Sequence, residues 1–283
     1  MAKYVLKNKR VVISGASGGF GKELAVRLVK NYGCNVIGIG RNEEKLRALQ
    51  DDLPGFTYRV FDVSNAKNWN DFACDLQRIG FTPDLLINNA GFLLPFAKTE
   101  YHSAKDAEEI LYTNFLSCFY SFSALLPLLK KSADPAVVNV SSSAALAPVV
   151  GTALYSASKA AVRNFTECLA MDYKNQIYVA GVYPGFTKTN IFSRQNGGAD
   201  NKILEKFCTP VDRAVGKILK KIKKRKIRII TGADAKAMNF FYRLFPSLTA
   251  KAIRAVLKKS DLEIFADIFH EKKSSSENNS AFL

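Results

Sequence analysis

The twenty residues RVVISGASGGFGKELAVRLV, at positions 10–29, place an apolar run, a glycine-rich turn and a helical pattern in succession. The run Val-Val-Ile at 11–13 predicts a buried strand, and the apolar residues between Leu24 and Val29 recur at helical spacing. Glycines let the backbone turn tightly and approach a pyrophosphate, which then lies at the N-terminus of the helix. The stretch is therefore typical of the first βαβ unit of a dinucleotide-binding domain, although its GxxxGxG spacing differs from the commoner GxGxxG.

The composition is that of an ordinary globular protein with a full core. The 283 residues, 48% hydrophobic and 23% charged, suffice for one large α/β domain. Residues 1–8 are too few and too polar for a signal peptide, and no apolar run reaches the ~18 residues of a membrane span. The five cysteines are scattered without a CxxC pair, which favours a reducing cytoplasm. Because the chain has two histidines, we expect no histidine-built metal site.

The predicted second strand, 35–40, is followed by an arginine. An NAD-binding chain usually carries an acidic residue there, for the ribose 2′-hydroxyl. The guanidinium of Arg41 can instead pair with a 2′-phosphate through charge-assisted hydrogen bonds, which favours NADP(H). A solvated arginine at the end of a strand is the alternative, because surface arginines are common.

Polar or small residues also follow the next two predicted strands, 56–61 and 84–87. Asp62 follows the first, and the sequence NNAG at 88–91 follows the second. An open α/β sheet binds its ligand at these carboxyl ends. Alternatively, Asp62 caps a helix that begins near residue 65, and NNAG is a plain turn.

A long helix is predicted over 107–130, with Asn114 inside it. Asparagine is a poor residue for the middle of a helix. We therefore expect its side chain either to face water or to take part in a buried polar network.

Residues 137–166 combine a buried strand, three serines and a helix that carries Tyr155 and Lys159. Residues four apart share one face of a helix, so the hydroxyl and the ammonium can point into one space. A phenol has a pKa of about 10, and a nearby positive charge lowers that pKa. Tyr155 can then exchange a proton with a substrate oxygen, which one of the serines can hold. Taken alone, the pair is better explained as a surface Tyr/Lys pair on an ordinary helix, and the other motifs of the chain reverse that preference.

The last part of the α/β pattern comprises a strand at 177–183, a helix at 211–226 and a strand at 228–231. Between them, residues 186–209 lack periodicity and contain Asn-Gly-Gly, which is typical of a mobile lid over a site.

Together these motifs resemble the short-chain dehydrogenase/reductase family over residues 8–232. In order, the motifs are GxxxGxG at 15–21, NNAG at 88–91, Asn114, Ser142 thirteen residues before Tyr155, Tyr155-x-x-x-Lys159 and Pro184-Gly185. The resemblance implies a doubly wound Rossmann fold with a seven-stranded, mainly parallel sheet and helices on both faces. One departure is Ser14, where the family usually has Thr, but the hydroxyl is kept.

The resemblance also implies a role for each motif residue. Tyr155 is the general acid/base, and Lys159 lowers its pKa and binds the nicotinamide ribose. Ser142 orients the substrate oxygen, and Asn114 holds a water in a proton relay. The implied cofactor-binding residues are Gly15, Ser17, Gly19, Phe20, Gly21, Arg41, Asp62, Val63, Asn89, Gly91, Tyr155, Lys159, Pro184, Gly185, Thr187 and Thr189. The resemblance implies no metal.

The basic charge belongs to the C-terminal part of the chain. Residues 213–273 contain 17 Lys and Arg against 5 Asp and Glu, and the remainder contains 24 against 20. We expect residues 233–270 to form a helical extension packed on the domain at 1–232, and residues 271–283 to be a disordered tail. The expected apolar face consists of Phe240, Phe241, Leu244, Phe245 and Leu248, and the basic face of Arg243, Lys251, Arg254, Lys258 and Lys259.

Two interpretations of this extension remain open. It can pack on the sheet or on a partner subunit with its basic side in water, or it can lie on an anionic membrane. The density of aromatic residues predicts that Phe240, Phe241, Phe245 and Phe265 are buried.

The sequence thus predicts an NADPH-dependent enzyme that reduces a hydrophobic, lipid-like ketone or aldehyde to the alcohol. The complete set of Ser142, Tyr155 and Lys159 counts against the alternative, a non-catalytic NADP-binding regulator. Because the basic segment lacks a recognition motif, we expect no nucleic-acid partner. We expect a cytoplasmic homodimer or homotetramer, with peripheral membrane contact as the open alternative for the extension.

Overall fold

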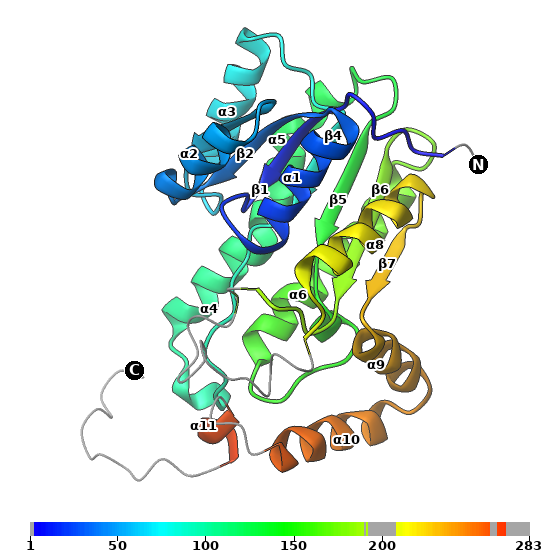
Figure 1. The fold of residues 1–283 in the computed structure, drawn as a ribbon. Helices are drawn as coiled ribbons and strands as arrows, with labels where there is room; N and C mark the ends of the chain where they lie inside the picture. Colours follow the sequence, from blue (N-terminus) through cyan, green and yellow to red (C-terminus); the bar gives the residue numbers. More distant parts are fainter. Residues whose placement is uncertain (1–2, 190, 192–207, 261–264, 270–283) are drawn as a thin grey trace.

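The computed structural model describes residues 3–189, 191, 208–260 and 265–269 (Figure 1). The predicted tail at 271–283 lies outside these residues, and so does most of the predicted lid at 186–209.

The described strands form one seven-stranded sheet, as the sequence predicts. The strands are β1 Arg10–Ser14, β2 Asn35–Gly40, β3 Phe56–Val60, β4 Leu85–Asn88, β5 Ala136–Val140, β6 Tyr178–Pro184 and β7 Arg228–Thr231. Their order is β3-β2-β1-β4-β5-β6-β7, and every neighbouring pair is parallel. The order reverses between β1 and β4, so a ligand site is expected at the carboxyl ends of these two strands.

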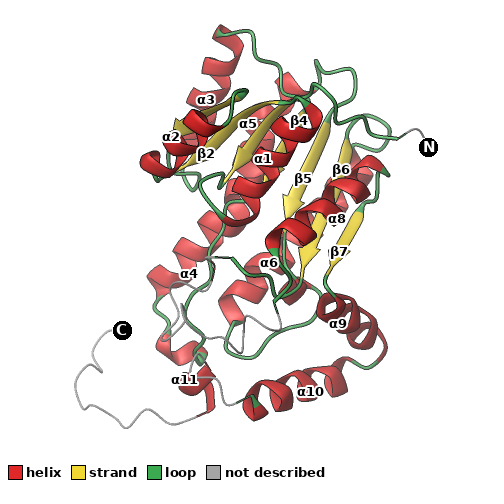
Figure 2. Cartoon of the chain, in the orientation of Figure 1, coloured by secondary structure: helices red, strands yellow, loops and turns green. Residues whose placement is uncertain are grey.

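Helices cover both faces of the sheet (Figure 2). The main helices are α1 Gly19–Tyr32, α2 Glu43–Asp52, α3 Ala66–Arg78, α4 Ala104–Leu111, α5 Ser117–Leu129, α6 Ala153–Asp172 and α8 Val211–Lys223. One buried cluster joins the sheet to α1, α2 and α8, and the other joins it to α3, α5 and α6. This is the doubly wound arrangement that the sequence predicts.

The predicted long helix differs from the structure in one functional detail. It begins at Ala104, where Ser103 and Asp106 form a reciprocal capping box, and ends at Leu129. Between α4 and α5, residues Tyr112–Leu116 form a π-helical turn that contains Asn114. Such turns are rare and are frequent at functional sites.

By length and composition, Ala104–Leu129 is the one candidate membrane span among the described residues. However, Phe122 and Leu125 lie in the core under the sheet, and Ser121 donates to the buried Asn88. We therefore interpret it as an internal helix of the domain.

Beyond β7 the chain forms α9 Ala233–Leu244, α10 Pro246–Lys259 and the short α11 Ala266–Phe269, all near the carboxyl end of the sheet (Figure 1). Phe265 is buried, and its ring packs edge-on against Phe96 with centroids 4.8 Å apart. Phe240, Phe241 and Phe245 are not buried within the subunit, because each is more than half exposed, and their burial against a partner subunit stays a prediction. The outer face of α9, which carries Phe240 and Phe241, points away from the sheet.

Candidate active site

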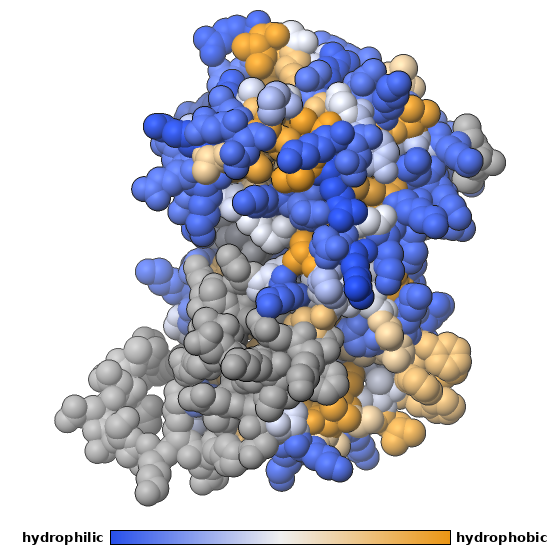
Figure 3. Space-filling model, viewed as in Figure 1, coloured by the Kyte–Doolittle hydropathy of each residue, from blue (hydrophilic) through white to orange (hydrophobic). Residues whose placement is uncertain are grey.

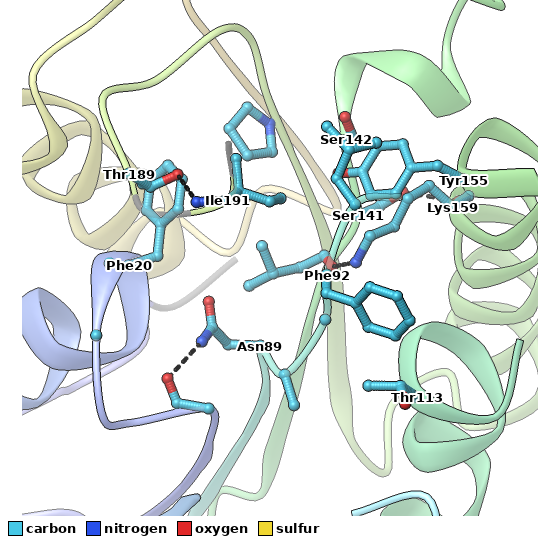
Figure 4. A pocket seen from close by; sticks show the side chains of 18 of the residues that line it. Phe20, Asn89, Phe92, Thr113, Ser141, Ser142, Tyr155, Lys159, Thr189 and Ile191 are labelled. Carbon is cyan, nitrogen blue, oxygen red and sulfur yellow. Dashed lines mark hydrogen bonds between the residues drawn. The ribbon is translucent and has the colours of Figure 1, made fainter. Parts of the chain in front are cut away.

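A cavity of about 410 Å³ opens at the carboxyl ends of β1, β2, β4, β5 and β6 (Figure 4). Every predicted site residue lines it except Gly21 and Asn114, which lie behind its wall. The cavity therefore brings together predicted residues that are up to 174 positions apart, from Gly15 to Thr189.

The glycine-rich turn between β1 and α1 depends on two close approaches. Gly15 has φ of 69°, a left-handed conformation that favours glycine, and a Cβ there would meet the Cα of Ala90 at 2.8 Å. A Cβ on Gly21 would collide with the carbonyl oxygen of Gly15. The N-terminus of α1 can thus lie against the turn, and its free amides face the cavity as an anion site.

Ser14 and Asn89 fasten this turn to the loop after β4. The Ser14 Oγ accepts hydrogen bonds from the amides of Asn89 and Ala90 at 3.0 and 3.1 Å. In return, the Asn89 Nδ2 donates to the carbonyls of Ser14 and Gly15, at 3.1 Å each. Ser14, which replaces the usual Thr of the family, therefore keeps the hydroxyl that joins the carboxyl ends of β1 and β4.

Arg41 and Lys45 supply positive charge at one end of the cavity. Both are exposed and line it, together with Ser17 of the glycine-rich turn. Asn42 caps α2, its Oδ1 accepting from the Lys45 amide at 2.9 Å, and so holds Lys45 in the first turn of the helix that follows Arg41. Lys45 was not predicted as a site residue, and its signal in the sequence was a second cation in the first turn of the helix that follows Arg41.

Asp62 follows β3 and holds its own loop. Its Oδ1 accepts from the Ser64 amide at 2.9 Å and from the Ser64 Oγ at 2.8 Å. The cap of α3 is Asn65, whose Oδ1 accepts from the Lys67 amide, so Asp62 is not the helix cap. Asp62 and Val63 remain available to border a planar ring in the cavity, as predicted.

Ser142, Tyr155 and Lys159 share one wall of the cavity (Figure 4). The Lys159 Nζ lies 5.9 Å from the centre of the Tyr155 ring and donates to the Val140 carbonyl at 3.2 Å. Ser142 is the least buried of the three serines, whereas the Ser141 Oγ donates to the Lys159 carbonyl at 2.8 Å. The geometry thus agrees with the choice of Ser142 over its neighbours.

Burial sets the protonation of this pair. It raises the pKa of Tyr155 to about 12, a rise that a hydrogen bond with Ser142 partly offsets. It lowers the pKa of Lys159 to about 8. Burial is the main cause of the raised phenol pKa, and the expectation that Lys159 lowers that pKa stays a prediction. Tyr155 accordingly keeps its proton at neutral pH and is suited to act as an acid.

Asn114 lies fully buried behind the cavity and ties three elements together. Its Oδ1 accepts from the Phe92 amide at 2.9 Å. Its Nδ2 donates to the Phe92 carbonyl at 3.0 Å and to the Ser158 Oγ at 3.1 Å, and that hydroxyl donates to the Tyr155 carbonyl. Of the two open expectations, the buried polar network is therefore confirmed, and Asn114 fixes the loop after β4 against the helix of Tyr155.

The first helix of the C-terminal extension holds the loop after β6. An oxygen of Asp234 accepts from the Phe186 amide at 2.7 Å, and a Cβ on Gly185 would collide with that carboxylate. The Thr187 hydroxyl donates to the Gly185 carbonyl at 2.9 Å. The position of Pro184, Gly185 and Thr187 in the cavity thus depends on α9.

The remaining wall of the cavity is apolar and was missed by the sequence analysis. It includes Phe92, Leu93, Phe96, Val149 and Ile191. Phe265 and Ile268, from the end of the extension, belong to the same buried cluster as Tyr155. These residues come from loops without periodicity, so the sequence offered no signal that would bring them together.

A doubly wound sheet, a glycine-rich turn at its switch point and a buried Tyr/Lys pair define a dinucleotide-binding oxidoreductase. The family model described as short chain dehydrogenase matches residues 9–199. The chain belongs to the short-chain dehydrogenase/reductase family.

Curated relatives and solved structures agree with this assignment. The NADP-dependent 3-hydroxy acid dehydrogenase YdfG of Salmonella typhi is 32% identical over 185 residues, which cover 65% of this chain and 74% of that protein. The serine 3-dehydrogenase of Agrobacterium fabrum is 35% identical over 191 residues, 66% of this chain and 76% of the other. The crystal structure of a short-chain dehydrogenase from Streptomyces avermitilis superposes with a TM-score of 0.75 and 25% identity, over 90% of this chain and 99% of that chain.

Proposed function

We propose that this protein reduces the carbonyl of a hydrophobic ketone or aldehyde to an alcohol, with NADPH as the reductant. The observation that carries the proposal is the cavity wall on which Ser142, Tyr155 and Lys159 meet, opposite a glycine-rich anion site. The family membership and the named activities of the relatives support an oxidoreductase.

The residues present fit NADP(H) as the cofactor. The amides at the start of α1 and the close approach at Gly15 suit a pyrophosphate, and Asp62 and Val63 border the place for the adenine. Arg41 and Lys45 suit a 2′-phosphate, because both are cations and Arg41 can form a bidentate pair with it. A serine dehydrogenase structure with NADP+ shares the fold at a TM-score of 0.71.

The catalytic roles follow from protonation and geometry. When bound, NADPH supplies the hydride that the carbonyl carbon receives. Tyr155 donates its proton to the carbonyl oxygen, while the Ser142 hydroxyl holds that oxygen by hydrogen bond. Lys159, charged below a pH of about 8, stabilises the phenolate that remains. Because the Asn114 side chain is engaged by the protein, a relay water there would be held by the main chain of its π-helical turn.

The substrate side favours an apolar carbonyl compound. Phe92, Phe96, Val149 and Ile191 line the cavity near Tyr155, and within the described residues no acidic or basic side chain other than Lys159 lines that part. Apolar walls of this kind hold a ligand mainly by burying its hydrophobic surface. We therefore propose a lipid-like substrate rather than a small charged acid.

The test is a turnover screen that follows NADPH oxidation against aliphatic ketones and aldehydes of increasing chain length. We expect kcat/KM to rise with chain length, and 3-hydroxy or 2-amino acids to be poor substrates for the reverse reaction. Preference for a short, charged carbonyl compound would overturn the substrate class while leaving the reaction type intact.

The pKa of Lys159 predicts the pH profile of the reduction. With a pKa of about 8, Lys159 is charged below that pH and neutral above it. Since kcat/KM reports groups of the free enzyme, it should be level from pH 6 to about 7.5 and fall by up to about tenfold per pH unit above 8. Parallel Kd values for NADPH separate loss of catalysis from loss of binding. A level profile to pH 9.5 would contradict the role of this charge.

We further propose a cytoplasmic homodimer that forms across α5 and α6. Phe119 of α5 and Met171 of α6 are exposed apolar side chains, as is Tyr112 of the π-helical turn before α5. The Phe119 ring packs against Phe165 with centroids 6.3 Å apart. None of the five cysteines, all in the described part of the chain, forms a disulfide, as suits a reducing compartment.

Substitution Phe119→Glu tests the dimer surface. A charge at the centre of an interface should weaken dimerisation by at least about 30-fold, which is the scale of a hot-spot residue. Analytical ultracentrifugation measures this, with Val60→Glu, on the exposed edge strand, as the matched control. An unchanged association constant for Phe119→Glu would place the dimer interface elsewhere.

A further inference from the structure

An exposed apolar corner lies where α9 meets α10. We define the corner patch as Phe240, Phe241, Leu244, Phe245 and Leu248, whose exposed fractions range from 51 to 66%. Figure 3 shows apolar side chains gathered over this corner, at the lower right. Scattered single apolar residues need no explanation, but five within nine positions form a patch of the kind that marks an interaction site.

The geometry of α9 keeps this patch outside the domain. Phe240, Phe241 and Leu244 share one face of the helix, at i, i+1 and i+4, while Ala235 is its buried contact with the domain. The rings of Phe240 and Phe241 pack edge-to-face with centroids 5.3 Å apart. Met238 of α9 and Leu257 of α10 pack on the buried cluster around Tyr155. The inner faces of the two helices are therefore already in contact with the domain. The patch therefore requires a partner from outside this subunit.

The surface around the patch is strongly basic. Residues 233–260 contain six Lys and Arg and one acidic residue, Asp234, which is engaged with the Phe186 amide. All six cations are exposed. On α10, Lys251, Arg254 and Lys258 follow one another at i, i+3 and i+7 and so form a stripe along one face. Lys251 and Arg254 line a pocket between α10 and the domain, and the Arg254 guanidinium lies over the Phe269 ring. The stripe therefore runs along the side of α10, and exposed cations and apolar side chains lie next to one another on the same two helices.

We propose that the corner patch and its basic stripe dock on an anionic lipid membrane. Helices that lie in a membrane interface combine aromatic and aliphatic residues with a face of Lys and Arg. Each basic residue near an anionic surface contributes by attraction to the headgroups, and the apolar residues enter the acyl boundary. The corner protrudes from the domain (Figure 1), so it can reach a flat surface before other elements collide with it.

A second copy of the chain and a nucleic acid each fit this surface less well than an anionic membrane does. A second copy of the chain in a two-fold interface would bring the same patch, with the same basic rim, against itself, and like charges would oppose that contact. A nucleic acid would satisfy the cations but leave five apolar side chains in water. An anionic bilayer can pair its headgroups with the cations and take up the apolar side chains at its acyl boundary.

Docking there would connect the membrane to the substrate cavity. The inner faces of α9 and α10 support the cluster that contains Tyr155, Phe96, Phe265 and Ile268. The proposed membrane surface and the apolar cavity wall are therefore opposite sides of one helical layer. Docking itself does not depend on the proposed reaction and is tested without substrate.

The experiment measures binding of the full chain to vesicles by co-sedimentation. The vesicles are phosphatidylcholine alone, or phosphatidylcholine with 30% phosphatidylserine. We expect binding to the anionic vesicles and at least about tenfold weaker binding to the neutral ones. Raising the salt to 0.5 M should weaken anionic binding, because screening shortens the reach of the surface potential.

Two variants separate the charges from the apolar corner. In the triple variant Arg243→Gln, Lys251→Gln and Lys258→Gln, loss of three cations should weaken binding to anionic vesicles by about 10²-fold. The matched control is Lys7→Gln, Lys30→Gln and Lys174→Gln, which removes the same charge from exposed positions outside α9 and α10 and should retain binding. The double variant Phe240→Ser and Phe241→Ser should lose at least about tenfold.

Other results would contradict the proposal. If the control triple variant loses binding to anionic vesicles equally, the effect comes from net charge and not from the basic stripe. If the unsubstituted protein binds anionic and neutral vesicles alike, the proposal is overturned. If the Phe240/Phe241 variant instead converts an oligomer to a smaller species while the unsubstituted protein ignores vesicles, the occupant is a second copy. Tighter, salt-sensitive binding to duplex DNA than to anionic vesicles would favour nucleic acid. Since the substituted side chains are exposed, thermal unfolding should remain within a few degrees of the parent and confirm folding.

Discussion

Replacing Tyr155 with Phe is expected to lower kcat for carbonyl reduction by at least about 10²-fold, the usual contribution of general acid–base catalysis. The substitution removes the transferable proton and keeps the ring. Burial holds the pKa of Tyr155 at about 12, so in the parent protein this phenol carries its proton at neutral pH and can deliver it to the carbonyl oxygen.

Two controls accompany this variant. The Kd for NADPH and the thermal unfolding should be little changed, because the ring packs in the cluster with Leu93 and Phe96 and the hydroxyl is not needed for that packing. Tyr183→Phe, at a buried tyrosine beyond the cavity lining, should retain turnover. Near-normal reduction by Tyr155→Phe would mean that another group supplies the proton, and the assignment of this wall would be wrong.

Replacing Arg41 with Ala is expected to raise the Kd for NADPH by about ten- to a hundredfold and to leave the Kd for NADH nearly unchanged. The lost interaction is a charge-assisted contact with the 2′-phosphate, worth roughly 1.5–3 kcal/mol. NADH lacks this phosphate, so the ratio of the two Kd values isolates the contact. Fluorescence titration of the reduced cofactor measures both values on the same protein.

The matched control for this prediction is Arg47→Ala on α2, the helix that follows Arg41. Arg47 pairs with Glu43 at 2.8 Å and does not line the cavity, so its loss removes the same charge without the proposed contact. A residual preference for NADPH in Arg41→Ala is expected, because Lys45 remains at the cavity. Equal Kd values for NADPH and NADH in the unsubstituted protein would contradict the assignment of this end of the cavity.

The sheet and the cofactor side of the site could be predicted from the sequence because their signals are local. Most of the strands contain a short apolar run, although β3, FTYRV, does not, and several carboxyl ends carry a residue type that a phosphate, ribose or ring requires. Gly15, Asn89 and Tyr155 appear in a fixed order, and a doubly wound sheet brings the ends of its strands to one edge. The residue pattern and the sheet topology together therefore predict which residues line most of the cavity, before any distance is known.

The shape of the helix around Asn114 could not be predicted in this way. An α-helix and a π-helical turn carry the same apolar pattern over five residues, so periodicity does not distinguish them. The asparagine itself was the signal of an irregularity. Its partners at Phe92 and Ser158 lie 22 and 44 positions away and appear only after folding.

The C-terminal extension shows a second limit of sequence patterns. An amphipathic pattern indicates that a helix has two faces, but it does not say which face meets the domain. We expected burial of Phe240 and Phe241 from their hydrophobicity, yet the inner contacts of α9 are made by Ala235 and Met238. The raised pKa of Tyr155 was not predicted for a related reason, since burial of a side chain is a property of the whole fold.

The measurement that tests the central proposal most directly follows a deuterium label from the cofactor to the product. NADPH deuterated at C4 of the nicotinamide is incubated with the protein and a long-chain aldehyde or ketone in ordinary water, and the alcohol is examined by mass spectrometry. We expect one deuterium on the carbinol carbon with the parent protein and with Tyr183→Phe, and almost none with Tyr155→Phe in the same time. Tight binding of NADPH without label in any alcohol, across aldehydes and ketones of all chain lengths, would contradict the reductase and favour a non-catalytic NADP-binding regulator.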